Sequence, residues 1–326
     1  PSFVKGADSS AIAGGGSQTV NNWATSISKG PADESTQTVS FNLSNNNNSL
    51  FSVQPAINST GNLTYTTASG VSGAATVNAT LSDSGSTANG GVNSSAAQAF
   101  TINIAADTIV PTAANLVASN ITVAGGTTGS FTVDYSDNVA VNSTSLDNLD
   151  IRVTGPAGFN QLATLVSFTP IGNGTPRTAT YQIAAPDGSW DLGDNGNYAI
   201  AIEPRQVSDI NNNFVATSNL GSFNVNILDP GSFNFSAANY DIAEGGGSAT
   251  ITVTRTSNTV AADISYGTND GTASAASDYT ATSGTLNFAI GETSKTFAIP
   301  INDDTLVEGS EIVALSLNNP TNGASL

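Results

Sequence analysis

Apolar and polar residues alternate along short segments of this chain. In the first third, the clearest examples are residues 38–43, 61–66, 75–81 and 99–104. Successive side chains of a strand point to opposite faces, so this alternation predicts half-buried β-strands. Clusters of Asn, Asp, Ser and Gly, such as 45–48, separate the segments and are typical of turns. Short strands at this spacing indicate a β-sandwich.

Two further series of alternating segments follow. The second series contains 129–135, 148–154, 163–168, 178–183, 196–202 and 221–227, and the third contains 248–255, 263–267, 284–288, 295–301 and 311–317. Short Pro-containing joints lie near 106–111 and 229–231. We therefore predict an all-β tandem array of three β-sandwich domains, with bounds at 1–107, 108–229 and 230–326. Joints of a few residues favour a semi-rigid array over a flexible string.

Composition narrows the possible partners. Among 326 residues there are 7 Lys and Arg against 25 Asp and Glu, a net charge of -18. Such a chain repels nucleic acid and anionic membrane, so we expect neither as a partner, whereas divalent cations should be attracted. The absence of His, Cys and Met excludes disulfides and thiolate or imidazole metal sites. No apolar run is long enough to span a bilayer, so we expect no membrane insertion.

The last hundred residues carry the sharpest candidate site. Their turn positions hold six acids: Glu244, Asp278, Asp303, Asp304, Glu308 and Glu311. Carboxylate-rich, oxygen-only clusters suit Ca²⁺. The alternative is a solvated acidic turn that aids solubility. We favour calcium, because clustered like charges destabilise a compact fold unless something neutralises them.

The same segment resembles the Calx-beta domain family. The resemblance is carried by residues 233–244, 249–255, 270–285 and 286–311. It implies a β-sandwich, and it implies calcium-ligand roles for Glu244, Asp278, Asp303, Asp304, Glu308 and Glu311. Thr305 stands where some members have a third acid. Relative to the family, the sequence stops at Leu326 before the last strand, so we expect a piece of a longer protein with an incomplete sandwich.

The first two predicted domains resemble, more loosely, immunoglobulin-like or cadherin-like repeats of bacterial surface proteins. Residues 30–34, 81–85, 135–139 and 206–213 carry this resemblance. It implies tandem β-sandwiches. The three predicted domains do not repeat one another closely, so they form a mixed array and not a solenoid.

Acids outside the last domain allow two readings. In the second predicted domain they are Asp134, Asp137, Asp187, Asp191, Asp194 and Asp209, and in the first they are Asp33, Glu34, Asp83 and Asp107. Asp side chains stabilise turns without any metal. A further ion site in the second domain, or one at the joint between the two domains, remains the alternative. Residues 187–195 lack the terminal Glu of an EF-hand loop, so we do not predict one.

These observations predict a binding protein and not an enzyme, since no nucleophile–base pair is present. We expect a calcium-stiffened structural or adhesive segment of a large extracellular, cell-surface bacterial protein. Its partners would be calcium ions, neighbouring domains or copies of the same protein, and surface glycans or proteins. Two alternatives stay open: a filament subunit joined by strand donation to the incomplete sandwich, and an adhesin module that binds carbohydrate or protein. Trp23 and Trp190 are predicted to be packing residues instead of sugar platforms.

Overall fold

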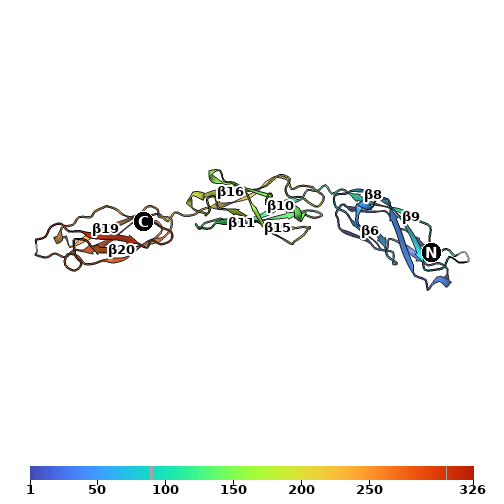
Figure 1. Cartoon of the computed structure of the whole chain (residues 1–326), viewed down its shortest axis with the longest axis horizontal. Coiled ribbons are helices and arrows are strands. Elements are labelled where there is room, and N and C mark those ends of the chain that lie inside the picture. The colour runs from blue at the N-terminus through green and yellow to red at the C-terminus, as the bar shows by residue number, and fades with distance from the viewer. Residues whose placement is uncertain (89–90, 306) are drawn as a thin grey trace. The chain divides into compact units, whose positions relative to one another are not determined.

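A computed structural model describes residues 1–88, 91–305 and 307–326. Nearly all of its regular structure is β-strand (Figure 1). Two compact units are present: the first comprises residues 1–120, 127–189 and 196–224, and the second comprises 121–126, 190–195 and 225–326. The fold class is all-β, with three β-sandwiches in tandem along the sequence, as predicted. The domain bounds given above stay a prediction.

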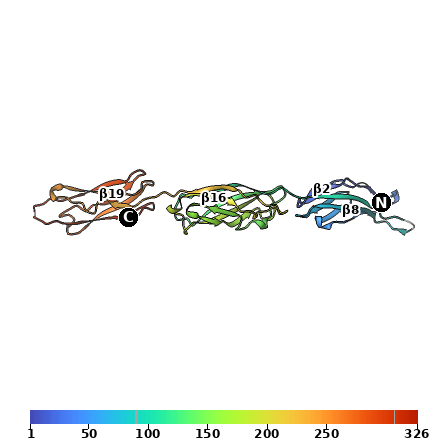
Figure 2. The same ribbon diagram turned by 90° about the horizontal axis from the view of Figure 1, so that it is seen from above.

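The first sandwich of the first unit is built from three sheets. Their strand orders are β1 (Ser2–Val4)–β4 (Thr25–Ser28); β2 (Ser9–Ile12)–β9 (Gln98–Ala105)–β8 (Gly73–Asp83)–β5 (Val39–Asn45); and β3 (Ser17–Val20)–β7 (Leu63–Thr67)–β6 (Phe51–Ile57), with 3-10 turns η1 (Ala32–Glu34) and η2 (Asn48–Leu50). β2 pairs with β9 in parallel, and the other pairs are antiparallel. Figure 2 shows β2 and β8 from above.

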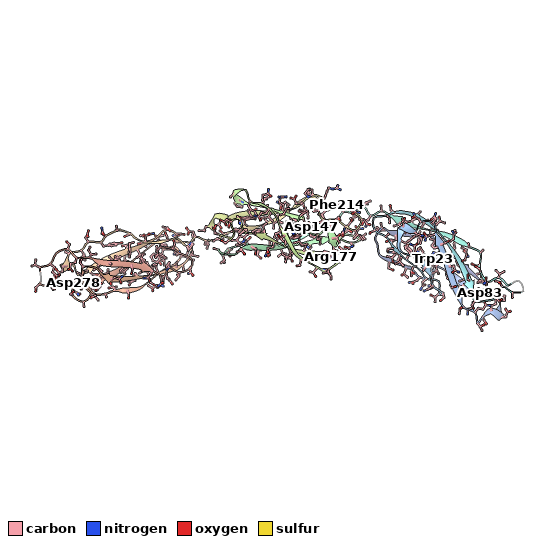
Figure 3. The ribbon with its side chains drawn as sticks, viewed as in Figure 1. Trp23, Asp83, Asp147, Arg177, Phe214 and Asp278 are labelled. Atoms are coloured by element: carbon pink, nitrogen blue, oxygen red, sulfur yellow. The ribbon has the colours of Figure 1, made fainter. Side chains whose placement is uncertain are left out.

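Alternation along β8 builds the core of this sandwich. Ala75, Val77, Ala79 and Leu81 are each 0% exposed, while the residues between them face outward. Trp23 joins this core (Figure 3), and its indole Nε1 donates a 2.8 Å hydrogen bond to the carbonyl of Ala7. The packing role predicted for Trp23 is therefore confirmed.

The second sandwich consists of two four-stranded sheets. Their orders are β10 (Thr112–Ala118)–β11 (Thr128–Ser136)–β15 (Arg177–Ala184)–β14 (Thr164–Thr169) and β13 (Asn160–Leu162)–β12 (Ile151–Thr154)–β16 (Gly196–Ile202)–β17 (Asn219–Val225), with 3-10 turns η4 (Ser143–Ser145), η5 (Pro156–Gly158) and η6 (Leu192–Asp194). The strand predicted at 148–154 begins only at Ile151. The preceding residues form a turn, in which the backbone N–H of Asp147 donates to Oδ2 of Asp150 at 2.9 Å.

The last sandwich, in the second unit, has two three-stranded antiparallel sheets. Their orders are β18 (Phe233–Phe235)–β19 (Ser248–Arg255)–β22 (Ser294–Pro300) and β21 (Ser283–Phe288)–β20 (Ala262–Asp270)–β23 (Val313–Asn318), and η7 (Glu244–Gly246) precedes β19. Phe233, Ile251, Val253, Ile264 and Phe288 form its core. β23 pairs with β20 along one edge, and no strand of the described residues pairs with its other edge.

Candidate metal centres

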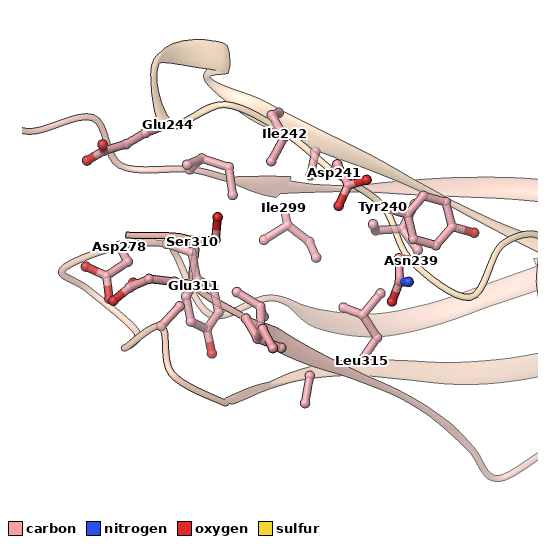
Figure 4. A pocket seen from close by; sticks show the side chains of 18 of the residues that line it. Asn239, Tyr240, Asp241, Ile242, Glu244, Asp278, Ile299, Ser310, Glu311 and Leu315 are labelled. Atoms are coloured by element: carbon pink, nitrogen blue, oxygen red, sulfur yellow. The ribbon is translucent and has the colours of Figure 1, made fainter. Parts of the chain in front are cut away.

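Three predicted acids converge at one end of the last sandwich. Asp278, Glu308 and Glu311 each offer one carboxylate oxygen, and these oxygens all lie within 4.8 Å of one another. Asp278 is half-buried, whereas Glu308 and Glu311 are exposed. Figure 4 shows Glu244, Asp278 and Glu311 at the same end of the adjoining pocket. This geometry places carboxylates from two separate loops where one cation could contact both.

The loop between β20 and β21 positions Asp278. Oδ2 of Asp278 accepts a 2.6 Å hydrogen bond from the backbone N–H of Ser274, and this bond is the main reason why the pKa of Asp278 lies below its usual range. The next residue, Tyr279, is buried at 1% exposure, and its hydroxyl donates to Oδ1 of Asp270 at 2.7 Å. Asp270 is therefore a structural acceptor at the end of β20. A buried aromatic ring thus anchors the turn that presents Asp278.

Glu308 and Glu311 have raised pKa values. Desolvation is the first cause for both, and neighbouring carboxylates add to it: Asp278 acts on both residues, and Glu244 and Asp304 also act on Glu308. A raised pKa means that the charged form is disfavoured where these side chains lie. A bound divalent cation would reverse this effect, because it stabilises the ionised carboxylates.

The remaining predicted acids lie in the same neighbourhood. The backbone N–H of Asp304 donates to Oε1 of Glu244 at 3.3 Å. Asp303 lies against Gly245, where a Cβ would come within 3.8 Å of Oδ2 of Asp303. All six acids therefore gather at one end of the domain, with three of them in the tight cluster. Leu306 lies outside the described residues. The assignment of these acids as ligands stays a prediction.

A cavity of about 880 Å³ adjoins the acids. Apolar side chains line it, including Tyr240, Ile242, Ile299, Ile301, Val313 and Leu315. It lies beside the unpaired edge of β23 and beside the segment that follows β18. Ile312, also in the lining, is 64% exposed. The cavity is therefore an open groove along a strand edge, with apolar side chains on its walls and the acids at one end.

Several other candidate acids have structural roles. Asp191 and Asp194 form a capping box around η6, because each side chain accepts a hydrogen bond from the backbone of the turn. Oδ1 of Asp134 accepts a 2.6 Å hydrogen bond from the hydroxyl of Thr178. Oδ1 of Asp83 accepts from the backbone N–H of Gly85 at 2.8 Å. These contacts match the turn-stabilising alternative considered for Asp in this chain.

Residues 227–326 match the Calx-beta domain family. The C-terminal part of the chain therefore resembles Calx-beta domains, a class of β-sandwich module, and is called the Calx-beta domain below. The sodium/calcium exchanger Calx of Drosophila melanogaster is 33% identical over 99 residues, which are 30% of this chain and 10% of the exchanger. The chain therefore spans about a tenth of the length of this curated relative.

Two solved structures resemble the same part of the chain. The apo-form Calx CBD1 domain is 32% identical, with a TM-score of 0.28, and the match covers 29% of this chain and 84% of that one. The calcium binding domain CBD12 of CALX1.1 is 33% identical, with a TM-score of 0.28, and covers 29% of this chain and 40% of that one. Across residues 1–88, 91–305 and 307–326, the structure contains no helix with the length and apolar character that a membrane crossing requires.

Proposed function

We propose that the Calx-beta domain binds Ca²⁺ through its clustered acids and that the ion stiffens the chain. The observation that carries this proposal is the convergence of Asp278, Glu308 and Glu311 within 4.8 Å. It is supported by the family match of residues 227–326 and by the calcium binding named for the similar CBD12 domain. Glu244, Asp303 and Asp304 would complete an oxygen-ligand shell of the kind that Ca²⁺ prefers.

The mechanism is neutralisation followed by ordering. Without an ion, the carboxylates repel one another across the loops that carry Asp278, Glu308 and Glu311. With Ca²⁺ bound, the loop between β22 and β23 is tied to the loop between β20 and β21. An ion present at a hundredfold over its dissociation constant would stabilise the folded domain by about 2.7 kcal/mol. Since small domains are stable by only about 5–15 kcal/mol, this is a large share.

Thermal unfolding of the 1–326 chain tests the proposal. The melting temperature should rise when Ca²⁺ replaces EDTA, and Mg²⁺ should give a smaller shift. Asp303→Ala/Asp304→Ala and Glu308→Gln/Glu311→Gln should each reduce the calcium response. Asp263→Asn is a matched control, because Asp263 lies on β20 and its side chain takes no part in the cluster. A calcium response that is undiminished in both double variants would rule out this site.

We further propose that the chain is a structural or adhesive segment of a large extracellular protein at a bacterial surface. A net charge of -18, the absence of Cys and a tandem β-sandwich architecture support this role. Binding, and not catalysis, is its proposed activity. Antibody labelling of intact cells tests the location, and labelling only after cell lysis would contradict it.

Strand acceptance is a second candidate function, and the groove beside β23 favours it. Ser325 bridges Ser232 in parallel, and the backbone N–H of Phe233 donates to the carbonyl of Ser325 at 2.9 Å. A strand continuing in this direction would run antiparallel to β23 and would face the apolar lining. The occupant we propose is an extended strand, donated by a second copy of the chain, with apolar side chains at alternate positions.

An extended chain tests strand acceptance. An alternating Val-Thr segment fused after Leu326 should raise the melting temperature and remove any concentration-dependent association, since it would fill the groove in cis. A Gly-Ser segment of equal length is the control. If both extensions behave alike and the 1–326 chain is monomeric at all concentrations, the groove accepts no strand.

Glycan binding has weaker support. Trp23 and Trp190 are 3% and 1% exposed, so neither offers a ring surface to a sugar.

A further inference from the structure

A second group of three carboxylates lies in the first unit. Asp107 follows β9, Asp137 follows β11, and Asp209 lies in the loop between β16 and β17. One oxygen from each residue lies within 4.8 Å of those from the other two. Asp209 is 0% exposed and Asp107 is 9% exposed. The ion pairs found among the described residues involve other acids, so no Lys or Arg there compensates these three charges.

Backbone hydrogen bonds hold two of the carboxylates in place. Oδ1 of Asp209 accepts from the N–H groups of Asn211 and Asn213, both at 2.8 Å. Oδ2 of Asp137 accepts from the N–H groups of Val139 and Ala140, at 2.7 and 3.0 Å. Both loops therefore fix their acid before any ligand arrives.

Side-chain amides from the same two loops hold the third carboxylate. Oδ2 of Asp107 accepts a 3.0 Å hydrogen bond from Nδ2 of Asn211. Oδ1 accepts from the N–H of Ile109 at 3.1 Å and from Nδ2 of Asn138 at 3.3 Å. Three segments far apart in the sequence thus meet at one point.

One oxygen in this group has no partner. Oδ1 of Asp137 is buried and accepts no hydrogen bond, although Oδ2 of the same side chain accepts two. Burying an ionised oxygen without a donor or a counter-charge is strongly unfavourable. Turn stabilisation uses only Oδ2 and so explains neither the burial of Oδ1 nor the approach of the other two acids. An oxygen left free in this way is what a cation ligand requires.

We propose that Asp107, Asp137 and Asp209 bind one Ca²⁺ ion. Calcium–oxygen distances are about 2.3–2.6 Å, so two ligands of one ion lie at most about 5 Å apart. The observed spacing of up to 4.8 Å falls within that limit. Zinc is disfavoured because the chain has no His or Cys. Carbonyl groups and water would supply the remaining oxygens of a calcium shell.

The ion would stabilise contacts that Asn211 makes with distant parts of the first unit. Besides Asp107, the side chain of Asn211 donates to the carbonyl of Ala13 at 3.1 Å and accepts from the N–H of Gly70 at 2.7 Å. Without a cation, three negative charges repel at the centre of this network. With the cation bound, loops 137–140 and 209–213 are tied to the segment that leaves β9. The site is therefore a second calcium-dependent joint, independent of the Calx-beta acids.

Calcium titration by calorimetry tests the proposal on the full 1–326 chain. In a Glu308→Gln/Glu311→Gln background, which removes two acids of the Calx-beta cluster, one Ca²⁺ per chain should still bind. Adding Asp137→Asn to that background should abolish this binding. Adding Asp187→Asn should leave it unchanged, because Asp187 is an exposed acid of the same unit and lies outside the group. Retained binding in the Asp137→Asn variant would overturn the proposal.

Hydrogen exchange on the unmodified chain gives a second readout that needs no substitution. With Ca²⁺ at a hundredfold over its dissociation constant, opening of loops 137–140 and 209–213 should become about 100-fold rarer. Loss of calcium binding at the Calx-beta domain alone would leave this protection intact, so the two sites fail separately. Unchanged exchange in both loops at saturating Ca²⁺ would show that the three acids bind no ion.

Discussion

The hydroxyl of Tyr181 donates a 2.6 Å hydrogen bond to Oδ2 of Asp150, and both side chains are 0% exposed. The Tyr181 hydroxyl also lies 3.1 Å from that of Tyr135. Burial raises the pKa of Asp150 to about 7, while the hydrogen bonds from Tyr181 and from the backbone N–H of Asp147 partly oppose the rise. Oδ1 of Asp150 is buried without a partner. The core of the second sandwich thus contains an acid that gains or loses its charge near neutral pH.

Asp150 should make the stability of the first unit depend on pH. Its folded pKa of about 7 lies above the ordinary value of 3.8, so the folded state holds the proton more tightly than the unfolded state. Stability should therefore fall as pH rises from about 4 to 7 and then level off, by at most about 4 kcal/mol at about 1.4 kcal/mol per pKa unit. Denaturant unfolding at pH 5 and pH 8 measures this fall.

Asp150→Asn is the variant that checks the cause, because Asn cannot ionise. The fall in stability between pH 5 and pH 8 should largely vanish in Asp150→Asn and persist in Asp187→Asn. An equal fall in both variants would assign the pH dependence to other groups.

Tyr181→Phe should keep the titration of Asp150 but raise its pKa, whereas Asp150→Asn removes the titration. Removing the hydroxyl deprives Oδ2 of Asp150 of a buried donor, which costs about 1–3 kcal/mol. Since that bond lowers the pKa of Asp150, the midpoint of the pH-dependent fall should move to higher pH. Unfolding curves across the pH range give both quantities. A loss of stability with no shift of the midpoint would mean that the Tyr181 hydroxyl does not favour the charged form of Asp150.

Tyr279→Phe should weaken calcium binding at the Calx-beta domain without touching a proposed ligand. The hydroxyl of Tyr279 anchors the turn of Asp278 through its 2.7 Å bond to Asp270. Loss of that bond should destabilise the domain by about 1 kcal/mol and lower the calcium affinity, because the turn becomes less ordered. Calorimetry of Tyr279→Phe against the unmodified chain measures the change. Tyr240→Phe is a comparison variant, since Tyr240 bonds the carbonyl of Thr252 and not this turn.

Ala276→Gly should stabilise the second unit. Ala276 has φ +76°, a left-handed conformation that costs a residue with a Cβ about 1–2 kcal/mol and that Gly adopts freely. Gly also makes the unfolded chain more flexible, which offsets part of this gain. We therefore expect a net increase of up to about 1 kcal/mol in the free energy of unfolding. Ala298→Gly, on β22, is the matched control and should destabilise by about 0.5–1 kcal/mol. The two melting temperatures should therefore move in opposite directions.

The fold class was predictable because strand periodicity is local. β5, β8 and β9 contain seven or more residues with regular alternation, and each overlaps a predicted segment. β1, β2 and β3 were not predicted, since strands of three or four residues carry too little alternation to stand out. β6 was also missed: Gln54 and Pro55 interrupt its pattern, and its pairing with β7 shifts register twice.

The sequence by itself determined the all-β class, because strand periodicity is local. It also indicated that Glu308 and Glu311 lie close together, because only two residues separate them in the chain. Only the tertiary structure brought Asp107 together with Asp137 and Asp209, since the sequence patterns assigned Asp107 to the first domain and the other two acids to the second. Asp150 gave no signal at all in the sequence, although burial makes it the acid with the most altered titration. Charge and periodicity can be read from the order of residues, whereas the burial of a side chain and the convergence of distant acids depend on how strands far apart in the sequence pack.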